Sequence, residues 1–166
     1  MTVSNKSYLK GYYDRTKALG RKVVNSDFTL EIEGFEGMFL LAPQCPWPVT
    51  TVAGEISVPT PLGVEAWEPQ QVKAAKQGQV RFMETVDAPI DQMLVELITQ
   101  GGTFNAKIYE GTPEKHLRYK RIIDAFIQVD DADRDWENRS QLLTFSGTMF
   151  YHYYGEVVNG NSADYR

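Results

Sequence analysis

The residues that could do chemistry in this chain are a run of aspartates, two histidines and one cysteine. The aspartate run, from Asp130 to Asp135, imitates the opening of a calcium-binding loop. Counted from Asp131, however, the sixth position is Trp136 instead of glycine and the twelfth is Leu142 instead of glutamate. The spacing therefore favours a solvated turn between strands over a metal site.

The histidines and the cysteine do not form a catalytic pattern either. His116 and His152 lie in different segments, without a cysteine or carboxylate at the spacing of zinc ligands. Cys45 is the single cysteine and has no histidine near it in sequence, so we expect a buried or idle thiol. No phosphate-binding loop, nucleophile elbow or dinucleotide-binding glycine motif occurs. We expect no enzyme activity, no metal and no cofactor.

Length and composition indicate a single globular domain. The chain has 166 residues, 42% of them hydrophobic and 23% charged, which is enough to bury a core without disulfides or metal. Its formal charge of −5 argues against a protein that binds nucleic acid through a basic surface. No apolar run approaches the roughly 18 residues of a membrane span, and the first residues lack the apolar core of a secretory signal. We expect folding in the cytoplasm and no membrane insertion.

The elements that must position any functional surface begin with a basic N-terminal arm, residues 1–26. This arm gathers Lys6, Lys10, Arg15, Lys17, Arg21 and Lys22. Tyr12 and Tyr13 interrupt the basic pattern, and the helical period is weak, so the segment is either a short helix or an extended arm. It is either a solvated tail or an arm that docks on an acidic neighbour.

Residues 27–100 contain two strand patterns, a turn-rich stretch and the clearest helix. Alternation predicts a strand over 27–32 that forms a hairpin with the apolar run 38–41. Residues 73–79 are a predicted polar turn before a strand over 80–86. Apolar residues spaced by three and four then predict a helix over about 89–100, with Asp87 as its N-cap and Gly101-Gly102 at its end.

The segment 42–71 is dense in proline and contains Trp47 and Trp67. Prolines at this density exclude a helix or a central strand over most of it. The segment is nevertheless too apolar for a disordered linker, since it also contains Ile56 and Val58. We predict a long ordered loop with one edge strand or hairpin, and long ordered loops are usually functional.

The C-terminal half predicts further antiparallel strands. Residues 103–109 and 117–129 have strand patterns, the second with a bulge near Ile122 and Ile123, and 130–138 form an acidic loop. In the last strand, within 142–154, one face is core-like. The other ends in Phe150, His152 and Tyr154, which are covered either by this chain's own helix or loops or by a neighbouring subunit.

These elements predict a mainly β fold with one flanking α-helix, arranged as a small antiparallel β-barrel or sandwich over residues 27–156. Residues 157–166 would then form a C-terminal tail.

The order of the elements resembles that of the tail tube proteins of contractile-tailed bacteriophages. The resemblance rests on Phe28 to Ile32, on Val80 to Val86 leading into the 89–100 helix, and above all on the aromatic ending from Leu143 to Glu156. It covers most of the chain and extends to the tubes of type VI secretion and other contractile injection systems. The long segment 42–71 and the residues after 156 depart from it.

The resemblance implies a structural protein of the virion tail, assembled in the host cytoplasm. Its copies would form homohexameric rings that stack into a hollow tube, with sheath, baseplate and tape-measure proteins as partners. DNA would pass through the lumen without specific binding, since a negative lumen repels phosphates. The alternatives are a tube-initiating baseplate protein, the tube of a secretion or injection system, and a small ligand-binding β-barrel. The expected subunit interface residues are Trp47, Ile56, Val58, Trp67, Phe150, His152, Tyr154, Tyr12 and Tyr13.

Overall fold

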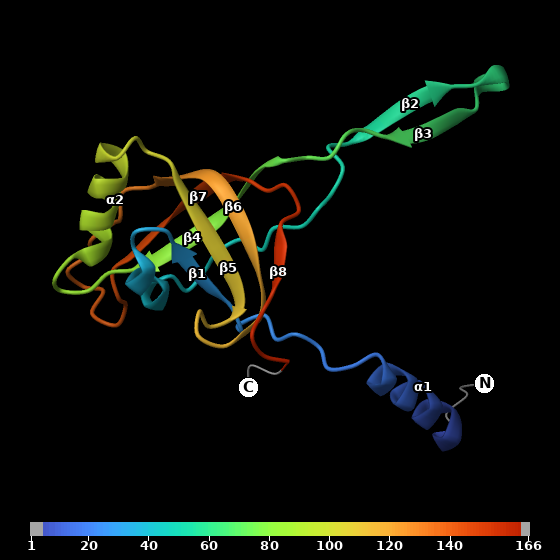
Figure 1. Ribbon diagram of the computed structural model, residues 1–166, viewed down its shortest axis with the longest axis horizontal. Coiled ribbons are helices and arrows are strands. Elements are labelled where there is room, and N and C mark those ends of the chain that lie inside the picture. The colour runs from blue at the N-terminus through green and yellow to red at the C-terminus, as the bar shows by residue number, and fades with distance from the viewer. Residues whose placement is uncertain (1–4, 164–166) are drawn as a thin grey trace.

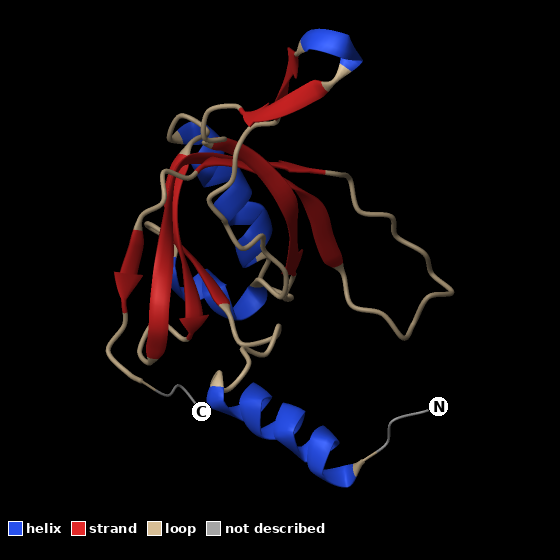
Figure 2. Ribbon diagram, turned by 90° about the vertical axis from the view of Figure 1, so that its right-hand side faces the viewer, coloured by secondary structure: helices blue, strands red, loops and turns tan. Residues whose placement is uncertain are grey.

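Six antiparallel strands form the main sheet of the protein, whose computed structural model describes residues 5–163 (Figure 1). The strand order is β1-β5-β6-β7-β4, and β8 also pairs with β6. The strands are β1 (Thr29–Ile32), β4 (Ala75–Met83), β5 (Phe104–Gly111), β6 (His116–Val129), β7 (Thr144–His152) and β8 (Val157–Asn159). Within the described residues β1 and β4 do not pair with each other, so the sheet curves around a core without closing into a barrel (Figure 2).

Alternation along the strands explains the core. Leu30 and Ile32 of β1 are buried, as are Val80 and Phe82 of β4. In the closing segment, Met149, Tyr151 and Tyr153 face the core, while Tyr154 is exposed. The prediction of a mainly β, sandwich-like fold, with one face of the last strand in the core, is confirmed.

A bulge interrupts the pairing of β6 with β5. Ile122 pairs with Ala106 of β5, but the next paired position is Ala125 with Phe104, so β6 carries an extra residue there. Asp124, at this point, has a left-handed backbone with φ 47°. Along β6, residues 116–125 pair with β5, residues 118–120 with β8 and residues 123–129 with β7. The bulge expected near Ile122 and Ile123 is therefore present.

Helix α2 (Pro89–Thr99) connects β4 to β5 and buries Ile90, Met93 and Leu97 against the core. Its N-terminal cap differs from the prediction, because the N-cap residue is Ala88 and not Asp87. The carboxylate of Glu84 instead accepts hydrogen bonds from the backbone N–H groups of Ile90 (3.2 Å) and Asp91 (3.0 Å). A carboxylate at this end of a helix satisfies free N–H groups and interacts favourably with the helix dipole.

Three local predictions were wrong. The apolar run 38–41 lies in a 3-10 helix, η1 (Glu36–Leu41). Strand β1 therefore forms no hairpin with this run and pairs with β5. Periodicity alone cannot distinguish such a short apolar run from a strand. The expected polar turn 73–79 instead contains the start of β4, whose polar residues are paired with β7. The segment expected as a C-terminal tail includes β8, and residues 164–166 lie outside the described residues.

Two extensions leave the β domain (Figure 1). One is helix α1 (Lys6–Ala18), joined to β1 by residues 19–28. The other is a two-stranded hairpin of β2 (Glu55–Pro59) and β3 (Glu65–Pro69), whose tip contains the 3-10 turn η2 (Pro61–Gly63). None of the helices among residues 5–163 is long and apolar enough to cross a membrane.

Candidate assembly surfaces

The β2–β3 hairpin extends away from the β domain and exposes apolar side chains. Trp67 is 67% exposed and Ile56 45%, while Val58 is half-buried. At the tip, Leu62 has a left-handed backbone with φ 63° and a fully exposed side chain. A lone two-stranded hairpin is at best marginally stable in water, and exposed apolar residues on such an element are typical of interaction surfaces.

The two faces of the hairpin differ in composition. Opposite residues of an antiparallel pair share a face, so the pairs Glu55–Pro69, Ser57–Trp67 and Pro59–Glu65 place Trp67 between two carboxylates. The other face carries Ile56 opposite Glu68 and Val58 opposite Ala66. The predicted residues Ile56, Val58 and Trp67 therefore share one hairpin, on two different faces.

Trp47 lies elsewhere, at the base of the hairpin, where it packs half-buried against the core. The Lys120 ammonium lies 4.5 Å from the centre of the Trp47 indole and 5.6 Å from the centre of the Tyr153 ring. The same ammonium donates a hydrogen bond to the carbonyl of Pro48, and burial lowers the pKa of Lys120. These contacts fix the chain where it leaves the β domain.

Lys76 makes the same kinds of contact with Val49, the residue that follows Pro48, and with Tyr153. Its ammonium donates a hydrogen bond to the Val49 carbonyl and lies 5.9 Å from the centre of the Tyr153 ring. Sequence reasoning missed both lysines, because the strand pattern gives no sign that these ammonium groups bond to the proline-rich segment. No signal marked Lys76, which falls in the expected polar turn 73–79, and only its place in a strand pattern marked Lys120.

Helix α1 carries a second exposed apolar surface, and none of its residues is buried. Tyr12, which is 51% exposed, and Tyr13, which is 60% exposed, were predicted to lie at a subunit interface. The Tyr8 hydroxyl donates to the Tyr12 hydroxyl (3.2 Å), and the Arg15 guanidinium lies 5.6 Å from the centre of the Tyr12 ring. The Asn5 side chain accepts from the Ser7 N–H and caps the helix.

The outer face of β7 is covered in part by this chain. Phe150 stacks on Phe126 of β6 with ring centres 4.9 Å apart and an interplanar angle of 15°. His152 Nδ1 lies 3.3 Å from the Asp124 carbonyl oxygen. Phe126 remains 43% exposed and Tyr154 69%, so this face still presents aromatic surface. Phe126 belongs to this surface but was missed, since its partner could be identified only from the strand register.

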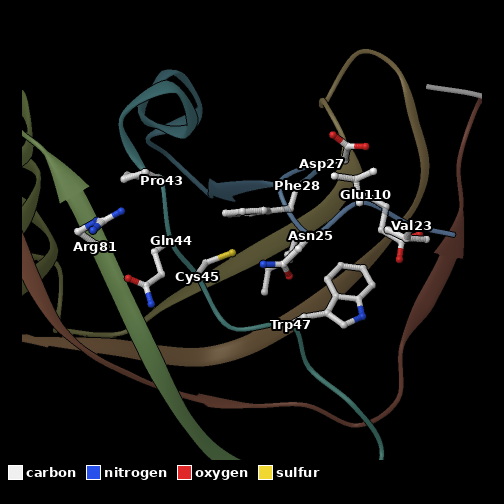
Figure 3. Close-up of a pocket in the computed structure, with 12 residues that line it drawn as sticks. Val23, Asn25, Asp27, Phe28, Pro43, Gln44, Cys45, Trp47, Arg81 and Glu110 are labelled. Carbon is white, nitrogen blue, oxygen red and sulfur yellow. The ribbon is translucent and has the colours of Figure 1, made fainter. Parts of the chain in front are cut away.

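A cavity of about 630 Å³ is lined by residues that precede β1, by residues within 43–47, and by side chains of β4 and β5. Figure 3 shows Cys45 and Trp47 lining it, with Phe28 and Asn25 nearby. Burial raises the pKa of the Cys45 thiol to about 12, so the thiol stays protonated near neutral pH and is a poor nucleophile. Glu110 at the edge of the cavity is paired with Arg118, Nε to Oε2 2.6 Å.

Metal-ligating side chains do not gather in the part of the chain that the structure describes. Over residues 5–163 no group of three or more His, Cys, Asp or Glu side chains is placed to hold an ion. His116 instead lies in an aromatic cluster, with its ring centre 4.7 Å from that of Tyr109 and 5.8 Å from that of Tyr119. The Tyr109 hydroxyl donates to Glu31 (3.1 Å), and burial followed by the Glu31 charge raises its pKa to about 12.

The predicted site residues thus lie on three separate surfaces. Ile56, Val58 and Trp67 are on the hairpin, Tyr12 and Tyr13 are on α1, and the β7 face with Tyr154 carries the last group. Trp47 lies on none of these surfaces and packs against the core. Their assignment to a subunit interface remains a prediction.

Solved structures share this fold, whereas no family model and no curated protein sequence matches the chain. A chain of the sheath-tube complex of PVC, an extracellular contractile injection system, in its extended state aligns with a TM-score of 0.57 at 12% identity, over 87% of this chain and 95% of that one. A chain of the tube-terminating cap of the anti-feeding prophage aligns with a TM-score of 0.55 at 12% identity, over 84% and 91%. A chain of the baseplate of the anti-feeding prophage aligns with a TM-score of 0.54 at 12% identity, over 84% and 97%.

The alignments extend over nearly the whole of each of those chains. The fold of this protein is therefore that of subunits found in contractile injection systems, in agreement with the resemblance drawn from the sequence. At this level of identity the likeness is one of fold.

Proposed function

We propose that this protein is a structural subunit of the tube of a contractile tail. In this proposal its copies form homohexameric rings that stack into a hollow conduit inside a sheath. The observation that carries the proposal is the fold, which is shared over 84–87% of the chain with subunits of sheath-tube, cap and baseplate assemblies. The exposed apolar hairpin supports it, because a subunit that only contacts solvent has no use for such a surface.

The proposed cargo is the DNA of a bacteriophage, which would enter a host through the tube. A formal charge of −5 supports a lumen past which phosphates slide, because like charges repel. The particle would be assembled in the host cytoplasm, with sheath, baseplate and tape-measure proteins as partners. The chain would have a structural and not a catalytic role, and the raised pKa of the Cys45 thiol is consistent with this role.

A tube-initiating protein of the baseplate is the second candidate, because a baseplate chain is among the structures that share the fold. The two roles differ in self-assembly. A repeating tube subunit adds to itself without limit, whereas an initiating protein stops at a ring until its partners bind.

Negative-stain electron microscopy of the purified full-length chain over a range of concentrations tests the proposal. Long hollow tubes support the repeating subunit, and isolated rings support the initiating protein. Monomers at every concentration contradict self-assembly and direct attention to the cavity near Cys45 as a ligand site. Small molecules that raise the unfolding temperature would then identify a binding protein.

A further inference from the structure

The two extensions of the molecule carry opposite charges. Helix α1 has four basic side chains and one aspartate, a formal charge of +3. The hairpin from Glu55 to Pro69 has three glutamates and no lysine or arginine, a formal charge of −3. Each extension also exposes aromatic or aliphatic side chains that the β domain does not cover. Opposite charge combined with exposed apolar surface is what two docking partners require.

The apolar residues of α1 share one side of the helix. At about 100° per residue they cover an arc of roughly 140°, and they are Tyr8, Leu9, Tyr12 and Tyr13. Lys10 and Lys17 lie beyond one edge of this arc and Arg15 beyond the other. The helix therefore presents an aromatic stripe with basic groups on both sides. A helix of 13 residues is marginal in water, so a docked stripe also stabilises the helix.

One face of the hairpin is the counterpart of this stripe. Glu65 and Trp67 follow each other on the same face of β3, and Glu55 lies on that face opposite Pro69. Neighbouring positions on one face of a strand are about 6.7 Å apart, so the two carboxylates are separated by roughly 13 Å with the indole between them. Lys6 and Arg15 of α1 are separated along the helix by about 13.5 Å, with the aromatic stripe between them.

We propose that α1 of one copy docks on the Glu55, Glu65 and Trp67 face of the hairpin of a second copy. This contact rests on the proposed assembly of copies and gives that assembly a specific pair of surfaces. It joins two different surfaces, so each copy offers α1 to one neighbour and its hairpin to another. Such a head-to-tail contact propagates along an assembly and does not stop at a dimer.

Charge reversal tests the contact with the full-length chain. One variant carries Lys6→Glu and Arg15→Glu, and a second carries Glu55→Lys and Glu65→Lys. The matched control carries Glu68→Lys on the opposite hairpin face and Asp131→Lys in the acidic loop. Its net charge therefore changes by the same amount as that of the second variant. Sedimentation velocity at about 50 mM and about 500 mM salt measures the assembled fraction, since salt screens exposed charges.

We expect each of the two variants to need at least about a tenfold higher protein concentration to assemble at low salt. The control should assemble like the unmodified chain. Mixing the two variants, or combining all four substitutions in one chain, should restore assembly, because every α1 then meets a hairpin of opposite charge. The variants should keep the circular dichroism spectrum of the unmodified chain, since all four side chains are exposed.

Each other outcome overturns the contact. If both variants assemble normally, or if mixing does not restore assembly, α1 does not bind the hairpin. If the α1 variant assembles normally but no longer sediments with anionic phospholipid vesicles that bind the unmodified chain, the partner of α1 is a membrane surface. If the unmodified chain itself stays monomeric, the proposed function fails together with the contact. Failure of the contact alone leaves assembly of the unmodified chain intact.

Discussion

The main sheet and the β2–β3 hairpin are both antiparallel, but they bury their apolar residues to different extents. In the β5–β6 pair, Ala106, Ile108 and Ile122 are completely buried by this chain. In the hairpin, Trp67 remains 67% exposed. The main sheet thus buries these apolar residues within one molecule, while the hairpin leaves its indole exposed, and in the proposed assembly a second copy covers it. Stability should therefore depend on the first region and assembly on the second.

The largest effect on stability should come from the core of the main sheet. Met149 is fully buried on β7, so Met149→Ala leaves a cavity and should lower the free energy of unfolding by about 2–5 kcal/mol. Urea unfolding followed by circular dichroism measures this change. Met149→Leu is the matched control, because it keeps the volume and should cost less than about 1.5 kcal/mol. Equal stability of the Ala variant would mean that this position is not in the core.

Alkaline pH should weaken the same region. The pKa of Cys45 is raised to about 12 from an ordinary value of 9.0, and that of Tyr109 to about 12 from 10.0. The folded state holds these protons more tightly than the unfolded chain. The stability that depends on them is therefore complete below about pH 9 and is lost as the pH rises toward 12.

Replacing Cys45 with alanine should remove its share of this loss, which is at most about 1.4 kcal/mol per pH unit. Unfolding free energies between about pH 8 and 10.5 test this expectation. The variant should show a shallower decline than the unmodified chain. Parallel declines would show that the thiol ionises in the folded protein.

The base of the hairpin, where the two regions meet, should show a smaller effect. Lys120→Met keeps the side-chain stem but removes the ammonium that contacts Trp47 and bonds to the Pro48 carbonyl. We expect a loss of about 1–2 kcal/mol in the free energy of unfolding, because the carbonyl loses its partner. Lys73→Met, at an exposed position, is the control and should change stability by less than about 0.5 kcal/mol. Identical unfolding curves for the two variants would show that the contacts of Lys120 with Trp47 and Pro48 contribute nothing to stability.

Local periodicity determines which parts of these two regions could be predicted from sequence. The core face of β7 and the helix α2 follow from periodicity, because their buried residues repeat at the period of the element. The start of β4 could not be predicted, since Lys76, Gln77 and Gln79 are polar residues that β7 places in a sheet. A hairpin in segment 42–71 was expected. Its position away from the core could not be predicted, because that position depends on how the whole chain folds.

The predicted interface residues also differ in whether the sequence could indicate their position. Trp67 and Tyr12 are exposed, as residues of an interface are in a single subunit. Trp47 was grouped with Trp67 because the two share a proline-rich segment. The Lys120 contact and the core packing of Trp47 depend on long-range placement, which local sequence does not encode.

The smallest effect on stability should come from the hairpin itself. Trp67→Ala removes an exposed indole, so we expect the free energy of unfolding to change by less than about 0.5 kcal/mol. The same substitution should raise the protein concentration needed for assembly by about tenfold or more, because buried tryptophans dominate contacts between subunits. Trp136→Ala is the matched control, since Trp136 is 96% exposed in the acidic loop outside the hairpin. If Trp67→Ala destabilises the isolated chain as strongly as Met149→Ala, the hairpin is part of the folding unit and the division between a stable core and an assembly surface is wrong.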